Sequence, residues 1–155
     1  DAATNLIKGR VLTTHFTHST VLALNAVLAE AAEALTDNLG NITESVIVQG
    51  ISSTQPFVAD NCVLAAGKYL LAESSKTSFE HVKPLFEALA RVIPPGGPVD
   101  TRRLALVVIR TISREDNELV RPHLETLVPP IFACVRDLVI PVKLAAEAAF
   151  LAIFS

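Results

Sequence analysis

A repeat of about 40 residues constrains the fold of this chain more than any other feature. The stretch PVKLAAEAAF aligns with TRRLALVVIR, and the alignment places Lys143 over Arg103. TRRLALVVIR aligns in turn with DNCVLAAGKY, about 40 residues earlier. All three stretches are rich in residues that favour helices. Self-similarity at this period predicts a row of stacked helical units instead of one closed core.

A second set of helices repeats alongside the first. VPPIFACVR resembles VKPLFEALA with Pro130 over Pro84, and each stretch precedes a helix of the first set. Between Pro84 and Arg103 lies IPPGGPVDT, which is dense in proline and glycine and is expected to be a loop. Two helices per unit, with a proline in the first and a basic residue opening the second, is the pattern of HEAT repeats. The sequence therefore predicts an all-α solenoid of about three and a half to four HEAT repeats.

Periodicity and end signals also predict where the helices lie. We expect helices at 19–36, 43–53 and 56–73, followed by one that opens with a capping box at Thr77 and Glu80 and one that starts near Thr101. A further helix over 116–136 should be bent or broken at Pro122 and again at Pro129 and Pro130. A last helix should end near 154. The first should end at DNLGN, where asparagine and glycine favour a left-handed cap. The whole chain, 1–155, is expected to be a single piece of a longer solenoid, with repeat boundaries near 38–41, 74–77 and 115–117.

Solenoid packing predicts which side chains are buried, because a helical pair cannot bury its apolar face alone. The helix after the capping box carries an apolar stripe of Val82, Leu85, Phe86 and Leu89. In the last helix, we expect Val142, Ala146, Ala149 and Ile153 to pack on the preceding pair. Phe150 and Phe154 would face a following pair, so we expect the isolated chain to self-associate through them.

The composition excludes several classes of protein. Half of the residues are hydrophobic, but charged residues interrupt every apolar stretch before it reaches the roughly 18 residues that span a membrane. The net charge of −3 argues against a protein that coats nucleic acid. Cys62 and Cys134 lie in apolar helical runs without CxxC spacing. We therefore expect two free, buried thiols in a reducing compartment.

Candidate catalytic and metal-binding residues are sparse. His15 and His18 in THFTH have i, i+3 spacing, which suits two metal ligands, but no acidic or cysteine partner lies at a matching distance. His81 and His123 stand apart from them. The sequence has no GxSxG elbow, no glycine-rich phosphate loop and no kinase signature. We expect a protein that is not an enzyme, with no catalytic, cofactor-binding or metal-binding residues.

The most suggestive surface feature is a set of arginines at i, i+7 and i+11, namely Arg103, Arg110 and Arg114, which we call the arginine edge. They fall within about 40° of one another around a helix. Arg102 and Arg121 extend the basic character over 102–121, although Glu115, Asp116 and Glu118 interrupt it. One interpretation is a patch for a negatively charged partner, either a protein face or ribosomal RNA.

The other interpretation is an ordinary solvated face. In that case Arg103 and Lys143 would bond to turn carboxylates such as Asp100 and Asp137 and hold successive repeats together. Asp137, Pro141 and Lys143 are on this view structural positions of the repeat. The residues alone leave both interpretations open.

The final third of the chain carries a more specific pattern. VxDxVIPVKLAAE runs from Val135 to Glu147. With the rest of 98–154, it resembles the C-terminal HEAT repeats of the large ribosome-associated translational activators of general amino-acid control, in particular the fungal ones. These are coactivators of the kinase that acts on the alpha subunit of translation initiation factor two. Residues 1–97 are compatible with the resemblance and less diagnostic.

The resemblance implies a cytoplasmic, non-enzymatic scaffold in starvation signalling, with no membrane segment and no cofactor. Members of that family bind the ribosome, hold the RWD domain of the kinase through a C-terminal region, and bind an ABC-type ATPase elsewhere on the full-length chain. No single contact residue carries over, and the resemblance leaves open whether this piece contacts the kinase itself or lies beside that contact. Direct RNA contact is left open. The alternative is a HEAT-repeat nuclear-transport receptor or phosphatase scaffold subunit, because the same helices serve both with different surfaces.

Overall fold

A computed structural model describes residues 37–73 and 79–155 of this chain. The described helices are α3 (Asp37–Ile51), α4 (Pro56–Glu73), α5 (Phe79–Val92), α6 (Val99–Glu115), α7 (Asn117–Val120), the 3₁₀ turn η2 (Arg121–His123), α8 (Leu124–Cys134) and α9 (Ile140–Ile153). Within these two ranges there is no strand. The expected helix at 19–36, the capping residue Thr77, and His15 and His18 lie outside the described residues.

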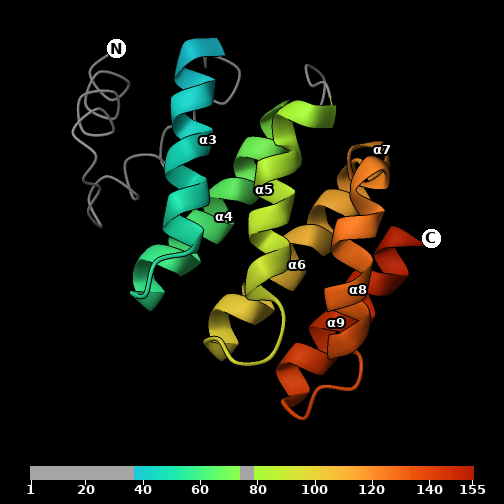
Figure 1. Ribbon diagram of the computed structural model, residues 1–155. Coiled ribbons are helices and arrows are strands. Elements are labelled where there is room, and N and C mark those ends of the chain that lie inside the picture. The colour runs from blue at the N-terminus through green and yellow to red at the C-terminus, as the bar shows by residue number, and fades with distance from the viewer. Residues whose placement is uncertain (1–36, 74–78) are drawn as a thin grey trace.

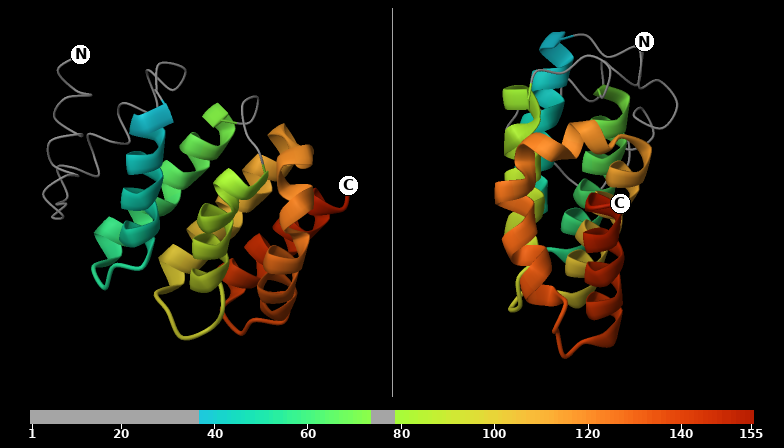
Figure 2. Two further views of the ribbon diagram at one scale, coloured as in Figure 1. Left: turned by 45° about the horizontal axis from the view of Figure 1, so that its top comes forward. Right: turned by 90° about the vertical axis from the view of Figure 1, so that its right-hand side faces the viewer.

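The helices form two layers that run side by side along the molecule (Figures 1 and 2). One layer contains α3, α5 and α8, and the other contains α4, α6 and α9. Consecutive helices pair across the layers, and each pair packs on the next, with α6 lying between α4 and α9. This arrangement confirms the predicted all-α solenoid. The described residues hold three such pairs, α3 with α4, α5 with α6, and α8 with α9.

The core is a continuous band of apolar side chains between the two layers. Its largest fully buried members include Tyr69 of α4, Phe86 of α5, and Leu106 and Ile109 of α6. The predicted stripe of α5 is confirmed, since Val82, Leu85, Phe86 and Leu89 have no exposed surface. The prediction for α9 is also confirmed, because Val142, Ala146, Ala149 and Ile153 are buried where α9 packs on α6.

Small residues set how closely α4 and α6 approach each other. A Cβ atom built on Gly67 of α4 would lie only 3.0 Å from Cγ1 of Val108 on α6. Glycine at this position therefore permits the close contact between these helices. In the loop between α5 and α6, Gly96 has a φ of 115°, a conformation that residues with a side chain rarely adopt.

Several predicted helix ends are wrong. The helix expected from Thr43 begins at Asp37, so 38–41 are helical. Acidic and amide residues favour the first turn of a helix, because their side-chain oxygens can accept hydrogen bonds from free backbone N–H groups there. The helix expected to start near Thr101 begins at Val99. As repeat boundaries, 38–41, 74–77 and 115–117 stay predictions; 74–77 lie outside the described residues, and α6 ends at Glu115.

The prolines act differently from one another. The predicted break at Pro122 is confirmed, because α7 gives way there to the 3₁₀ turn η2. At Pro129 and Pro130, where we expected the helix to be bent or broken, it is not broken, because both lie inside α8, as Pro84 lies inside α5. A bend at these prolines stays a prediction. Pro141 is in the first turn of α9, where a missing N–H removes no helical hydrogen bond.

The last pair exposes much apolar surface. Phe132 of α8 is 61% exposed, and Leu151 and Phe154 in or next to α9 are 69% and 58% exposed. Phe150 is partly buried and contacts the rings of Phe132 and Phe154. Self-association through these aromatic residues stays a prediction. In the described part of the chain, no helix is long and apolar enough to cross a membrane.

Candidate functional site

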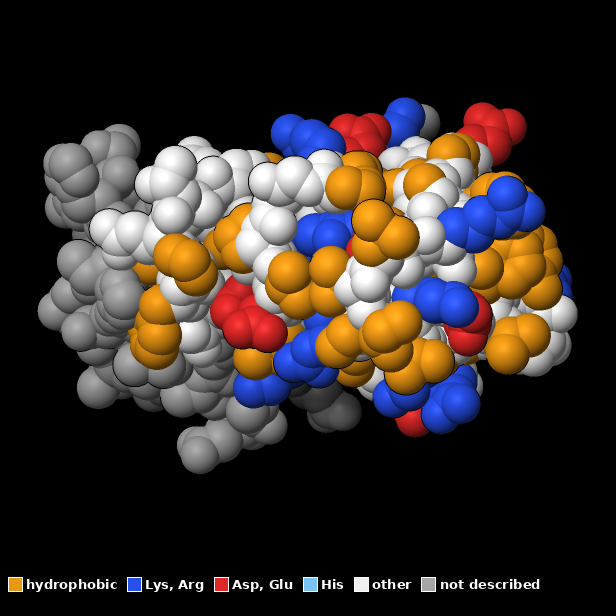
Figure 3. Space-filling view, turned by 90° about the horizontal axis from the view of Figure 1, so that it is seen from below, with side chains coloured by type: hydrophobic (Ala, Val, Ile, Leu, Met, Phe, Trp, Pro, Cys, Tyr) orange, Lys and Arg blue, Asp and Glu red, His pale blue; other side chains and the backbone are white. Residues whose placement is uncertain are grey.

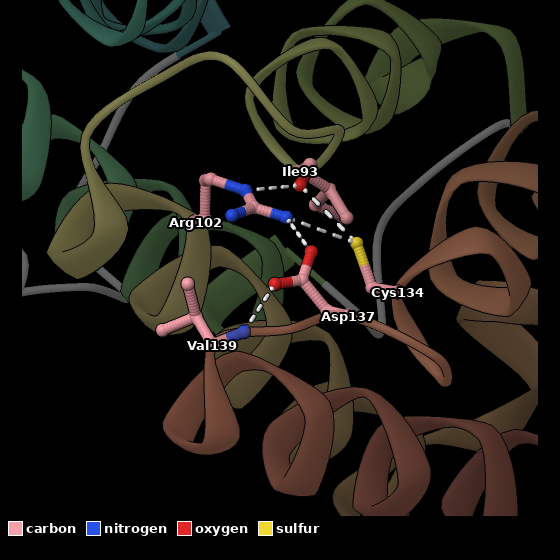
Figure 4. A network of polar contacts seen from close by, with 5 residues as sticks. All are labelled: Ile93, Arg102, Cys134, Asp137 and Val139. Atoms are coloured by element: carbon pink, nitrogen blue, oxygen red, sulfur yellow. Dashed lines mark hydrogen bonds and ion pairs between the residues drawn. The ribbon is translucent and has the colours of Figure 1, made fainter.

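A buried polar network joins the last two helical pairs (Figure 4). Its centre is Arg102 in the first turns of α6, which is 3% exposed. Nε of Arg102 donates a 2.8 Å hydrogen bond to the carbonyl oxygen of Ile93, directly after α5. Its Nη2 forms an ion pair with Asp137, in the turn before α9, and lies 3.5 Å from Sγ of Cys134 in α8. One side chain thus contacts residues at the ends of three other helices.

Asp137 is held on both sides. Its Oδ2 pairs with Arg102, and its Oδ1 accepts a 2.9 Å hydrogen bond from the backbone N–H of Val139. The hydrogen bond from Arg102 and then the one from Val139 hold the pKa of Asp137 below its usual value. The carboxylate therefore stays charged and fixes the turn that leads into α9. The role of Asp137 as a structural position of the repeat stays a prediction.

Thr101, which precedes Arg102 on α6, contacts the preceding helical pair instead of the following one. Thr101 is 3% exposed, and its hydroxyl donates a hydrogen bond to Oδ1 of Asp60 on α4. Adjacent helix residues point about 100° apart. Thr101 and Arg102 can therefore bind the preceding and the following helical pair from a single turn of α6. The two residues align the middle pair with both of its neighbours.

This network corrects three predictions. Arg102 was expected on an exposed basic patch, but it is buried and neutralised by Asp137. In the interpretation of an ordinary solvated face, Arg103 and Lys143 would bond to turn carboxylates such as Asp100 and Asp137, but neither makes an ion pair with a described residue. Arg102 occupies the place beside Asp137 instead. The alignment by residue type placed the basic position one residue late. The apolar stripe of α6 could have identified Arg102 as the buried basic residue, because Arg102 lies three and four residues before the buried Ala105 and Leu106 and so shares their face of the helix.

The arginine edge lies on the surface of α6. Arg103 and Arg110 are half-buried and Arg114 is exposed, and none of the three forms an ion pair with a residue that the structure describes. The Nε atom of Arg110 is buried without a hydrogen-bond partner. These arginines remain available to acidic groups of a partner. Figure 3 shows Lys and Arg side chains among hydrophobic ones on the face where the helices of each pair are joined.

Arg121 does not belong to this edge. It lies in η2, on a different helical segment, and forms a 3.0 Å ion pair with Glu118. Its Nε also donates to Oδ1 of Asn117. The side chains of Arg121 and Glu118 are 64% and 77% exposed, and such pairs contribute little to stability. Arg121 is therefore locally satisfied, unlike Arg114.

Of the remaining candidates for chemistry, Cys62, Cys134 and His123 are described by the structure and are buried. Cys62 and Cys134 are free and buried, as predicted. Burial raises the pKa of Cys62 to about 12, which disfavours the reactive thiolate. His123 stacks on Phe86 at a ring distance of 4.4 Å, and burial lowers its pKa. Among the described residues, no group of three or more His, Cys, Asp or Glu side chains is placed to hold a metal ion.

Comparisons with known proteins agree with this architecture. Residues 17–155 match the family described as GCN1-like, C-terminal HEAT repeats. The chain is 35% identical over 177 aligned positions to a protein of Saccharomyces cerevisiae named eIF-2-alpha kinase activator GCN1. That alignment covers 99% of this chain and 7% of the yeast protein. No solved structure matches the chain. From the repeat, the two-layered fold and this match over nearly all of its residues, the chain belongs to the family of GCN1-like C-terminal HEAT repeats.

Proposed function

We propose that this chain is a non-enzymatic, protein-binding part of a cytoplasmic translational activator that stimulates the kinase acting on initiation factor two alpha. The observation that carries the proposal is the similarity to the yeast kinase activator over 99% of the chain. Because the chain spans only 7% of that relative, the role assigned here is one segment's share of a larger activity. The resemblance supports this role over a nuclear-transport receptor or a phosphatase scaffold.

The surface of α6 supports binding as the mode of action. Arg103, Arg110 and Arg114 present positive charge without a carboxylate partner among the described residues. We propose that this edge binds the RWD domain of the starvation kinase, with the ribosome as the site where the full-length protein acts. An ABC-type ATPase partner would bind elsewhere on the full-length chain.

The test is a titration of the chain against the purified RWD domain at two salt concentrations, beside a variant carrying Arg110→Ala and Arg114→Ala. Saturable binding that the double variant and added salt both weaken would support a contact on the arginine edge. An Arg121→Ala, Arg136→Ala variant is the matched control, since it removes the same charge outside α6. Absence of binding, or equal loss in the control, would contradict the proposal.

A further inference from the structure

An apolar groove lies between α4 and α6 on the exposed side of the two helices. Its volume is about 200 Å³. The buried residues Gly67, Val108 and Ile112 form its floor. More accessible residues line its sides, namely Leu64, Lys68 and Leu71 from α4 and Val107 and Thr111 from α6.

The groove leaves apolar surface in contact with water. Leu64 is 40% exposed, although it lies directly beside this hollow. The absence of a side chain at Gly67 keeps the floor open where α4 meets Val108. A cavity of about 150 Å³ lined by aliphatic side chains accommodates a benzene molecule. By that comparison, this groove has room for one or two large apolar side chains of a partner.

Cationic side chains surround the apolar floor. On α6, Arg103, Val107, Thr111 and Arg114 are spaced by four, four and three residues, so they share one face of the helix. This stripe has a cation at each end and groove-lining residues in the middle. On α4, Lys68 lies between Leu64 and Leu71 on the groove itself. Lys68, like the two arginines, makes no ion pair within the described ranges. Glu115, four residues after Thr111, adds one carboxylate beside Arg114.

We propose that the groove is a docking site for an acidic amphipathic helix. Of its apolar side chains at i, i+3 or i+4, and i+7, one or two would enter between α4 and α6. Its carboxylates would pair with Lys68, Arg103 and Arg114 around the apolar contact. A nucleic acid would satisfy the cations but leave the apolar floor unfilled, so a protein helix is the better match. The inference rests on the proposed scaffold function, but it does not require the RWD domain to be the partner.

The test uses a fluorescent designed peptide of about 16 residues, with leucine at the groove-facing positions i, i+4 and i+7, glutamate beside them and alanine elsewhere to favour the helix. Anisotropy titrations would compare the unchanged chain with Leu64→Glu and Arg114→Glu. Arg136→Glu, in the exposed turn before α9, is the matched control because it makes the same charge change away from the groove. Circular dichroism would verify that every variant is folded. A peptide of the same composition in scrambled order would test the need for an apolar face.

We expect saturable binding that each groove variant weakens at least tenfold and Arg136→Glu changes less than twofold. The scrambled peptide should bind at least tenfold more weakly. The proposal is overturned by absence of saturable binding, by equal loss in Arg136→Glu, by tighter binding of a single-stranded RNA of equal charge, or by a dimer that Leu64→Glu dissociates. Because the probe is a designed peptide, its result is separate from that of the RWD titration. Either proposal can therefore fail alone.

Discussion

Replacing Gly67 by alanine tests the close approach of α4 and α6. The new Cβ atom would lie 3.0 Å from Cγ1 and 3.4 Å from Cγ2 of Val108. Val108 is 6% exposed, and a β-branched side chain on a helix has essentially one χ1 rotamer, so it cannot easily move aside. Alanine gains about 1 kcal/mol of helix propensity over glycine, whereas an extra methyl group in a packed interface costs about 1–3 kcal/mol. With a cost near the middle of that range, we expect a net loss of about 1 kcal/mol.

Urea and thermal unfolding would give this difference in stability. Unfolding would be followed by circular dichroism, because the chain has no tryptophan whose fluorescence could report it. A loss of about 1 kcal/mol should lower Tm by about 2–4 °C in a chain of this size. Gly97→Ala is the control, because nothing lies within 4 Å of its added Cβ, and it should change stability by less than about 0.5 kcal/mol.

The same substitution in a chain that carries Val108→Ala tests this contact a second time. In a Val108→Ala chain the clash is relieved, so Gly67→Ala should become stabilising by about 1 kcal/mol through helix propensity alone. The sign of the substitution would then reverse between the two backgrounds. Gly67→Ala that stabilises the unchanged chain, or effects that simply add, would refute the close packing on which this reasoning depends.

Three further predictions concern buried groups. Arg102→Met should lower the stability by about 1–3 kcal/mol, seen as a lower urea midpoint, because it leaves the carboxylate of Asp137 without its cation and removes one of the two donors to the Ile93 carbonyl. Arg103→Met should change the stability by less than about 0.5 kcal/mol, and equal effects would contradict the assignment of Arg102. His123 has a lowered pKa when folded, so the unfolded chain binds its proton first. Stability should therefore be complete above about pH 6.5 and fall as pH decreases towards the folded pKa, and His123→Phe should reduce this loss between pH 7.5 and 5. Cys62 should react with a thiol reagent at pH 8 far more slowly in the folded chain than in urea, and fast labelling of the folded chain would argue against its burial.

The solenoid could be predicted from the sequence because its period is set by residue types that recur. Apolar stripes such as Leu85, Phe86 and Leu89 identify the buried face directly, and the structure confirms them. Helix ends were harder to predict. Pro129 and Pro130 lie inside α8, because tertiary packing can hold a helix across a residue that weakens it locally.

The polar network could be predicted only in part. Asp137 was identified from its place in the repeat, but its partner was placed at Arg103 or Lys143 instead of Arg102. A shift of one residue moves a side chain by about 100° around a helix, from the surface to the core. Residue type alone cannot tell which of the two neighbouring arginines, Arg102 or Arg103, is buried. The positions of the buried apolar residues around the helix can. The groove between α4 and α6 was not predicted, since it depends on the contact between Gly67 and Val108, far apart in sequence.

The measurement that tests the central claim most directly is a side-by-side titration of this chain with the RWD domain of the starvation kinase and with a nuclear-transport GTPase. A scaffold of translational control should bind the RWD domain saturably, with affinity that falls as salt increases, and should not bind the GTPase. Binding to the GTPase without binding to the RWD domain would contradict the proposed function and favour a transport receptor built from the same repeats.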